Sequence, residues 1–268
     1  MFKTHKDAMF PDPTPERVYS ICRIVAYKGS SSGDLQKASS LYQDASQTLP
    51  EVSASIRVAE ELGIIQNADG VYNLAISADN LNTYVKFRQY VSGRVYRQKD
   101  TTFFKVTEWY LFNNEKMVKY DSWEDKAAAA VQAGIDGVKE NDMLGWRFWA
   151  SFLGEGYLHA RLLIPNMKVR LQDVLATQFS KTFKYDNEIP AKNFLEWLQA
   201  NIPEVPLLND APLVLGVSNG LRSLLECGLI SLRAQMDAQR YRLYAIEGET
   251  FNDFSHVTVK EVVADGLE

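Results

Sequence analysis

The stretch that decides the fold occurs in two versions, AEELGIIQNADGVYNLA at residues 59–75 and LLECGLISLRAQMDAQRYRLYAI at residues 224–246. Each version contains the apolar end of a helix, a glycine, two aliphatic residues, a short polar turn and a second strand with tyrosine. The Asp-Gly pair of the first version, between two apolar runs, is a strong β-hairpin signal. The two versions therefore predict the same module near each end of the chain, a helix that glycine breaks into a hairpin.

The residues before the first version predict three short helices. Thr14 can cap the first helix with Pro15 at its first position, and apolar residues then recur at helical spacing as far as Gly29. A second helix is expected at residues 33–44 and a third at residues 51–62, where Gly63 ends it. These elements and the hairpin predict an N-terminal domain at residues 1–78.

The C-terminal copy is expected at residues 190–248. Its first helix is predicted at residues 190–202, a short second helix within residues 203–214, and a third helix that ends at Gly228. Gly216 and Gly220 weaken the third helix, because glycine has a low helix propensity. A hairpin is expected at residues 231–246. An acidic tail at residues 249–268 follows, and the alternation in HVTVKEVV predicts a strand that pairs with another segment.

The middle of the chain, residues 79–189, has the pattern of a helical domain. Ser122 is a predicted helix cap, with Glu124 and Asp125 in the first turn, where acidic side chains suit the helix dipole. The aromatic-rich segment at residues 145–165 is expected to be a buried helix. The predicted fold class is mainly α with small β-hairpin wings, in which winged helix domains at both ends flank this helical middle.

Composition limits the class of protein. The chain has 268 residues, 46% of them hydrophobic and 24% charged, as is typical of a globular protein. No apolar run approaches the ~20 residues that span a bilayer, and the first residues lack the apolar core of a secretory signal. Cys22 and Cys227 both fall in expected helices and are predicted to be buried, reduced thiols. A cytoplasmic protein without a membrane partner is expected.

Catalytic and metal sites have no clear signal in the sequence. His5, His159 and His256 are isolated, and His159 is expected to be an ordinary helix histidine. No phosphate-binding glycine loop is present, and the paired carboxylates fit helix caps better than acid–base chemistry. We therefore expect a protein that is not an enzyme, with no catalytic residue, no metal ligand and no cofactor.

A predicted helix at residues 84–99 carries the strongest basic signal. Its segment KFRQYVSGRVYRQK has five positive charges and no acidic residue, and residues 81–189 as a whole have 16 Lys and Arg against 13 Asp and Glu. One helical face is apolar, and another gathers the basic side chains with Tyr90 among them. Those on this face are Lys86, Arg94 and Arg97. They can contact a phosphate backbone, or they form a solvated face that pairs with acids elsewhere, including the tail.

The third helix of each end module supplies the other candidate DNA contacts, since such a helix often enters the major groove. The exposed positions expected on the first are Ser53, Ser55 and Arg57. Those expected on the second are Ser218, Asn219, Arg222 and Ser223. The second hairpin adds Arg233, Arg240 and Arg242. The third helix of the second module has fewer acidic residues on its expected exposed face, so we expect the second module to bind DNA better than the first.

The arrangement resembles three families of tandem winged helix-turn-helix proteins. Plasmid replication initiators join two such domains but are usually more basic than this chain, whose net charge is −5. The kleisin-binding accessory subunits of SMC complexes are often acidic and act through protein contacts. The order of parts is also similar to the DpdG-type accessory proteins of bacterial anti-phage defence islands, which are associated with deazaguanine-modified DNA.

The sequence thus leads to two hypotheses. The first is a non-enzymatic DNA-binding or DNA-sensing component of a prokaryotic multi-protein system for anti-phage defence, whose partners are DNA and other subunits of that system. The second is a winged-helix adaptor that holds partner proteins without touching DNA. A homodimer is compatible with either hypothesis.

Overall fold

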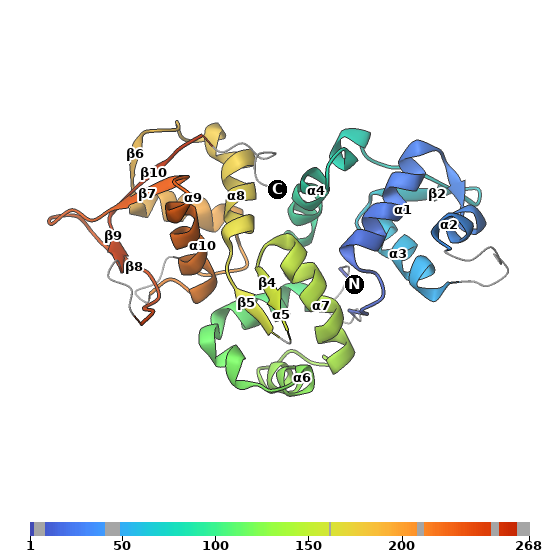
Figure 1. Ribbon diagram of the computed structural model, residues 1–268, viewed down its shortest axis with the longest axis horizontal. Helices are drawn as coiled ribbons and strands as arrows, with labels where there is room; N and C mark the ends of the chain where they lie inside the picture. The colour runs from blue at the N-terminus through green and yellow to red at the C-terminus, as the bar shows by residue number, and fades with distance from the viewer. Residues whose placement is uncertain (3–8, 41–48, 161, 208–211, 248–251, 262–268) are drawn as a thin grey trace. The chain divides into compact units, whose positions relative to one another are not determined.

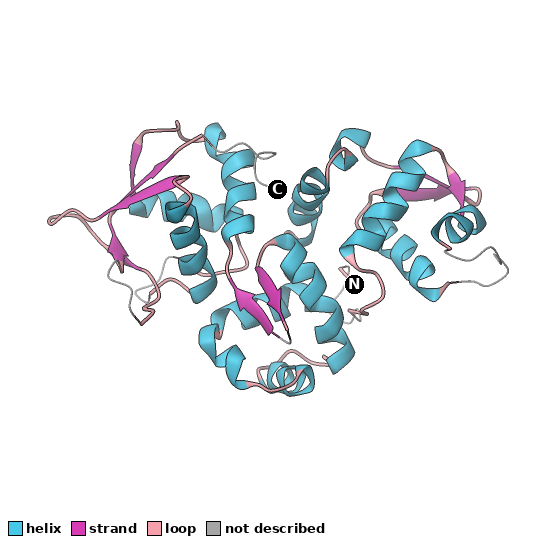
Figure 2. Cartoon of the chain, in the orientation of Figure 1, coloured by secondary structure: helices cyan, strands magenta, loops and turns pink. Residues whose placement is uncertain are grey.

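The expected glycine breaks are present in the computed structural model, which describes residues 1–2, 9–40, 49–160, 162–207, 212–247 and 252–261 (Figure 1). Gly63 and Gly228 both have positive φ, 65° and 68°, at the points where a helix passes into a strand. Glycine suits this left-handed backbone because it has no Cβ to clash. The described chain is mainly helical with small antiparallel sheets, as the sequence predicted (Figure 2).

The chain divides into two compact units. Unit 1 comprises residues 1–106 and 122–152, and unit 2 comprises residues 107–121 and 153–268. In this division the expected helical middle, residues 79–189, contributes to both units rather than standing alone.

Unit 1 begins with three helices and a small sheet. These elements are α1 (Pro15–Tyr27), β1 (Ser30–Ser31), α2 (Ser32–Ser39), α3 (Pro50–Glu61), β2 (Ile65–Ala68) and β3 (Val71–Leu74). Thr14 caps α1 by accepting a hydrogen bond from the Arg17 amide, as predicted. The β2–β3 hairpin is also confirmed: it turns at Asp69 and Gly70, which both have positive φ, and Ile65 pairs with Leu74. The sheet order is β1-β3-β2.

Four longer helices follow in the chain, separated by turns and short 3-10 helices. They are η1 (Ala78–Leu81), α4 (Tyr84–Val95), α5 (Thr102–Phe112), η2 (Asn114–Lys119), α6 (Trp123–Gln132) and α7 (Glu140–Leu153). The Ser122 cap of α6 is confirmed and forms a reciprocal capping box with Asp125. The buried Phe2 packs edge-on against Phe103 and Trp149, which places the aromatic core of unit 1 around α5 and α7.

The expected long helix at residues 145–165 is wrong in its second half. Helix α7 ends at Leu153, and a two-stranded sheet of β4 (Gly156–His159) and β5 (Leu162–Pro165) follows in unit 2. Gly154 has φ +90°, which ends the helix, and a Cβ on Gly156 would collide with the carbonyl oxygen of Ile164 on the paired strand. His159 therefore lies exposed on a strand rather than in a helix.

Unit 2 repeats the element order of the start of unit 1. Its remaining elements are α8 (Lys168–Gln178), η3 (Phe179–Lys181), β6 (Glu188–Pro190), α9 (Ala191–Asn201), α10 (Leu215–Glu226), β7 (Ile230–Arg233), β8 (Tyr241–Arg242), β9 (Asp253–Phe254) and β10 (His256–Val259). The three-stranded sheet has the order β6-β10-β7, with β10 in the centre as β3 is in unit 1. Helix, strand, helix, helix, strand and strand thus occur in this order in both units, with η3 and the short strands β8 and β9 inserted in unit 2.

This repeat begins one helix earlier than the sequence indicated. Helix α9, expected first, is the second helix of the repeat, and α8 is the first. The described residues 203–207 and 212–214 contain turns but no helix, and residues 208–211 of that expected second helix lie outside the described chain.

The expected C-terminal hairpin at residues 231–246 is also wrong. Strand β7 pairs with β10 of the tail, with Ser231 opposite Thr258, and the short β8 pairs with β9. The tail segment at residues 252–261 is therefore part of the fold of unit 2, and the prediction of a pairing strand at HVTV is confirmed. The second part of the expected tail, residues 262–268, lies outside the described chain.

Candidate nucleic-acid interface

Helix α4 and the turn after it present the basic side chains that the sequence singled out. Thr83 caps the helix by accepting a hydrogen bond from the Lys86 amide at 3.1 Å. Phe87, Val91 and Val95 are buried, so the predicted apolar stripe faces the core. Lys86 and Arg94 are exposed on the remaining surface of the helix. The sequence therefore predicted the buried face correctly, but the helix is shorter than the expected residues 84–99. It ends at Val95, so Arg97 and Lys99 are exposed in the turn that follows it.

Arg94 differs from its basic neighbours because it contacts the end of α3. Its Nε donates to the carbonyl oxygen of Leu62 at 3.1 Å, and its guanidinium lies 5.8 Å from the centre of the Tyr90 ring. The Tyr90 hydroxyl donates to the carbonyl oxygen of Gly63 at 3.4 Å. A Cβ on Gly63 would collide with the Arg94 guanidinium. Arg94 thus satisfies a carbonyl at a helix C-terminus, where positive charge is favourable.

The basic side chains of Lys86 on α4 and of Arg97 and Lys99 in the turn after it are available to a ligand. Within the described part of the chain, Lys86, Arg97 and Lys99 form no ion pair and no side-chain hydrogen bond. Such unpaired exposed cations lose little when they exchange water and counterions for a phosphate.

Helix α3 exposes fewer of the expected DNA-contacting side chains than the sequence predicted. Ser55 is 1% exposed and its hydroxyl donates to the carbonyl oxygen of Glu51, so the expectation that it is exposed is wrong. Ser53 is half-buried and accepts a hydrogen bond from Gln36 at 3.0 Å. Arg57 is exposed, and Glu60 and Glu61 follow it on the same helix. One available cation beside two carboxylates makes a poor surface for DNA.

Ser218 and Arg222 of α10 are buried, which corrects the expectation that they form an exposed reading face. The Ser218 hydroxyl accepts a hydrogen bond from the amide of Tyr244 at 2.8 Å. Arg222 donates from Nη2 to the carbonyl oxygen of Tyr244 at 2.8 Å and to Asn252 at 3.2 Å. Both side chains therefore hold the segment that returns along α10.

The adjacent face of α10 is covered by the residues that lead into α8. Asn219 donates to the carbonyl oxygen of Pro165 at 2.9 Å, and the Ser223 hydroxyl accepts from Asn166 at 3.2 Å. A Cβ on Gly220 would stand 2.9 Å from the backbone nitrogen of Lys168. The glycines that the sequence suggested would weaken this helix instead allow this close packing. All four candidate residues of α10 are thus engaged within unit 2.

The arginines near β7 and β8 remain at the surface. Arg233 lies 3.4 Å from Glu188 and Arg240 lies 3.1 Å from Asp253, in ion pairs whose side chains are 39–68% exposed. Arg242 is exposed. Exposed ion pairs contribute little stability, so a phosphate can replace either acid at low cost.

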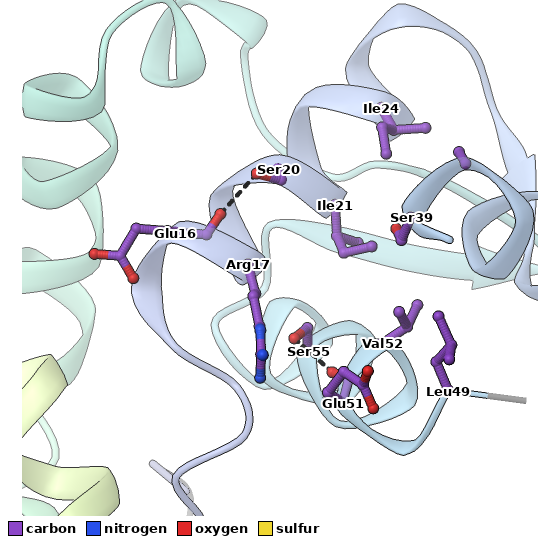
Figure 3. Close-up of a pocket in the computed structure, with 11 residues that line it drawn as sticks. Glu16, Arg17, Ser20, Ile21, Ile24, Ser39, Leu49, Glu51, Val52 and Ser55 are labelled. Atoms are coloured by element: carbon purple, nitrogen blue, oxygen red, sulfur yellow. Dashed lines mark hydrogen bonds between the residues drawn. The ribbon is translucent and has the colours of Figure 1, made fainter. Parts of the chain in front are cut away.

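A groove that sequence analysis did not identify lies on unit 1 between α1, the end of α2 and the start of α3 (Figure 3). Its volume is about 430 Å³. The apolar residues that line it are Ile21, Ile24, Ala38, Leu49 and Val52, and the polar ones are Glu16, Arg17, Ser20, Ser39, Glu51 and Ser55. These residues come from three separate segments, so no local motif could have revealed the groove.

The cysteines differ in burial. Burial raises the pKa of the Cys22 thiol to about 12, so this cysteine is protonated at neutral pH. Cys227 is exposed, which corrects the expectation that both thiols are buried. Among the described residues, no group of three or more His, Cys, Asp or Glu side chains is placed to hold a metal ion.

His5 lies outside the described chain. None of the described helices is long and apolar enough to cross a membrane. Comparison with protein-family models, with curated proteins and with solved structures finds no match for this chain.

Proposed function

We propose that the protein is a non-enzymatic DNA-binding component of a prokaryotic multi-protein system and that it holds the phosphate backbone rather than reading bases with its helices. The single observation that carries this proposal is a set of exposed cations, Lys86 on α4 and Arg97 and Lys99 in the turn after it, next to an arginine fixed by the end of α3. Five cations within residues 86–99, without an intervening acid, suit a nucleic-acid backbone.

We further propose that each unit contains a winged helix-turn-helix module. The support is the recurrence of the same six elements and of the same sheet order, first-third-second, in both units. With the α10 face covered by the start of α8, unit 2 would contact DNA through its strands rather than through that helix. The expectation that the second module reads bases with α10 is therefore not part of this proposal.

The role in anti-phage defence is proposed from the resemblance to the accessory proteins of such systems. A component that binds duplex DNA without sequence readout would suit a system that handles foreign or modified DNA. Its partners would be DNA and the other subunits of that system.

The test is a binding titration of a fluorescent duplex with the full chain. The triple variant K86A/R97A/K99A should bind at least tenfold more weakly at low salt, because about three phosphate contacts are lost. The matched control is K116A/K119A/K139A, which removes the same charge from exposed sites elsewhere. If the two triple variants bind the duplex with equal affinity, the proposal is contradicted, because net charge alone would then explain binding.

A second function, protein adaptor, is favoured by the groove on unit 1. The groove has a volume of about 430 Å³ and is lined in part by aliphatic side chains. It can take one or two large apolar side chains of a partner helix. If this function holds, Ile24→Glu should abolish co-purification of a partner after nuclease treatment. The control Tyr27→Glu places the same charge on α1 at a side chain that is 89% exposed and outside the groove, and should have no effect.

A further inference from the structure

The connection from β7 to β8 in unit 2 forms a short arm, residues 234–240, on a fixed base. The Gln235 amide donates to the hydroxyl of Ser255 at 2.9 Å, and Ser255 is 2% exposed. The Gln235 carbonyl oxygen accepts from Nε of Arg240 at 3.3 Å. Both backbone polar groups of Gln235 are therefore held, one by the core of unit 2 and one by the far end of the arm.

Met236 follows this fixed residue and is 91% exposed, more than any other large hydrophobic side chain among the described residues. Methionine is usually buried, because moving its apolar side chain out of water is favourable. A flexible, polarisable apolar side chain next to an anchored backbone is suited to enter a narrow apolar space on a partner.

The charges around the arm favour an anionic partner. Arg233, Arg240 and Arg242 stand before and after the tip, and Asp237 is the one acid within residues 234–240. Arg233 and Arg240 form exposed ion pairs with Glu188 and Asp253, in which a phosphate can replace the carboxylate at low cost. Guanidinium groups on both sides of an apolar tip match a duplex, in which phosphates border each groove and stacked bases present an apolar interior. Proteins that bend DNA commonly insert such an apolar side chain between base pairs from the minor groove.

We propose that Met236 is a wedge that enters the minor groove and partly unstacks one base step of a bound duplex, while the neighbouring arginines hold the phosphates. The proposal rests on the DNA-binding function proposed above and names the kind of DNA that unit 2 would prefer. A flexible pyrimidine–purine step, such as TA, unstacks more easily than a stiff A-tract. Unit 2 would thus select DNA by deformability, which needs no reading face on α10.

The experiment uses the full chain and two duplexes of about 20 base pairs. One has a central TA step and the other a central A-tract, and each carries 2-aminopurine, whose fluorescence rises when its base unstacks. Wild-type protein should raise the fluorescence of the TA duplex and bind it more tightly than the A-tract duplex. Met236→Ala should lose the fluorescence rise and bind the TA duplex about fivefold or more weakly. Met236→Leu, which keeps an apolar tip, should retain both properties.

Two results would overturn the wedge while the DNA-binding function stands. The first is that Met236→Ala binds and unstacks the TA duplex as wild type does. The second is that wild type binds without any fluorescence rise, so that no step is opened. If wild type binds neither duplex, the DNA-binding function itself fails, and the wedge fails with it. The exposed position of Met236 leaves folding intact in these variants, which thermal unfolding should verify.

Discussion

The Nε atom of Arg94 lies 3.1 Å from the carbonyl oxygen of Leu62 and donates a hydrogen bond to it. This bond joins α4 to the end of α3, at the glycine that turns the chain into the β2–β3 hairpin. Arg94 was expected to contact DNA, yet its guanidinium is already used inside unit 1. It therefore differs from Lys86 on the same helix and from Arg97 in the turn that follows the helix.

Arg94→Ala should destabilise the protein. Loss of a charged hydrogen bond to a helix-end carbonyl costs about 1–2 kcal/mol of unfolding free energy. Urea unfolding measures this loss, with Arg97→Ala as a control that removes an exposed cation from the turn after the same helix. If the two variants unfold at the same urea concentration, the bond to Leu62 has no stabilising role.

Ser218→Ala should also lower stability, although Ser218 was a candidate DNA contact. The substitution leaves the Tyr244 amide without its acceptor and should cost about 1–3 kcal/mol. Amide hydrogen exchange at Tyr244 should speed up in this variant. Unchanged protection at that amide would contradict the assigned hydrogen bond.

Gly220→Ala and Gly93→Ala form a matched pair, because both replace a glycine within a helix. At Gly220 the new methyl group would stand 2.9 Å from the backbone of α8, so we expect a loss of about 1–3 kcal/mol. At Gly93 nothing lies within 4 Å, so the higher helix propensity of alanine should add about 0.5–1 kcal/mol. Thermal unfolding should shift in opposite directions, and a shift of the same sign would contradict the packing of α10 on α8.

Cys22 should make stability depend on alkaline pH. Its pKa is raised by burial from 9.0 in the unfolded chain to about 12 in the folded protein. The unfolded chain therefore loses this proton first, and stability that is present below pH 9 should decline as the pH rises toward 12. Cys22→Ala should remove this component from a pH series of urea unfolding. A thiol reagent at neutral pH should modify Cys227 and leave Cys22 unmodified until the protein unfolds.

The features predicted well from sequence are those that neighbouring residues determine. Thr14 and Ser122 cap their helices through bonds that span three residues, and the Asp69–Gly70 turn needs only the two backbone conformations that these residues favour. The apolar stripe of α4 repeats at helical spacing, so its buried face could be read directly.

The features predicted wrongly depend on partners far along the chain. Strand β7 was assigned to the nearest downstream segment, but its partner β10 lies beyond β8 and β9, and no local signal distinguishes the two. Ser218 and Arg222 are polar residues on a helix, which local pattern treats as exposed, yet they bond to Tyr244 across the fold. The spacing of Gly216 and Gly220 could have indicated close helix packing, since a helix side without side chains lets another backbone approach.

The central claim is that exposed basic side chains of α4 and of the turn after it hold a DNA backbone. Its most direct test is the slope of log affinity against log salt concentration for the wild-type chain and for K86A/R97A/K99A, between about 50 and 200 mM salt. Each phosphate contact contributes about 0.9 to the slope, so the triple variant should lose between about two and three units. A slope that equals that of wild type, or no binding by wild type at the lowest salt, would contradict the claim.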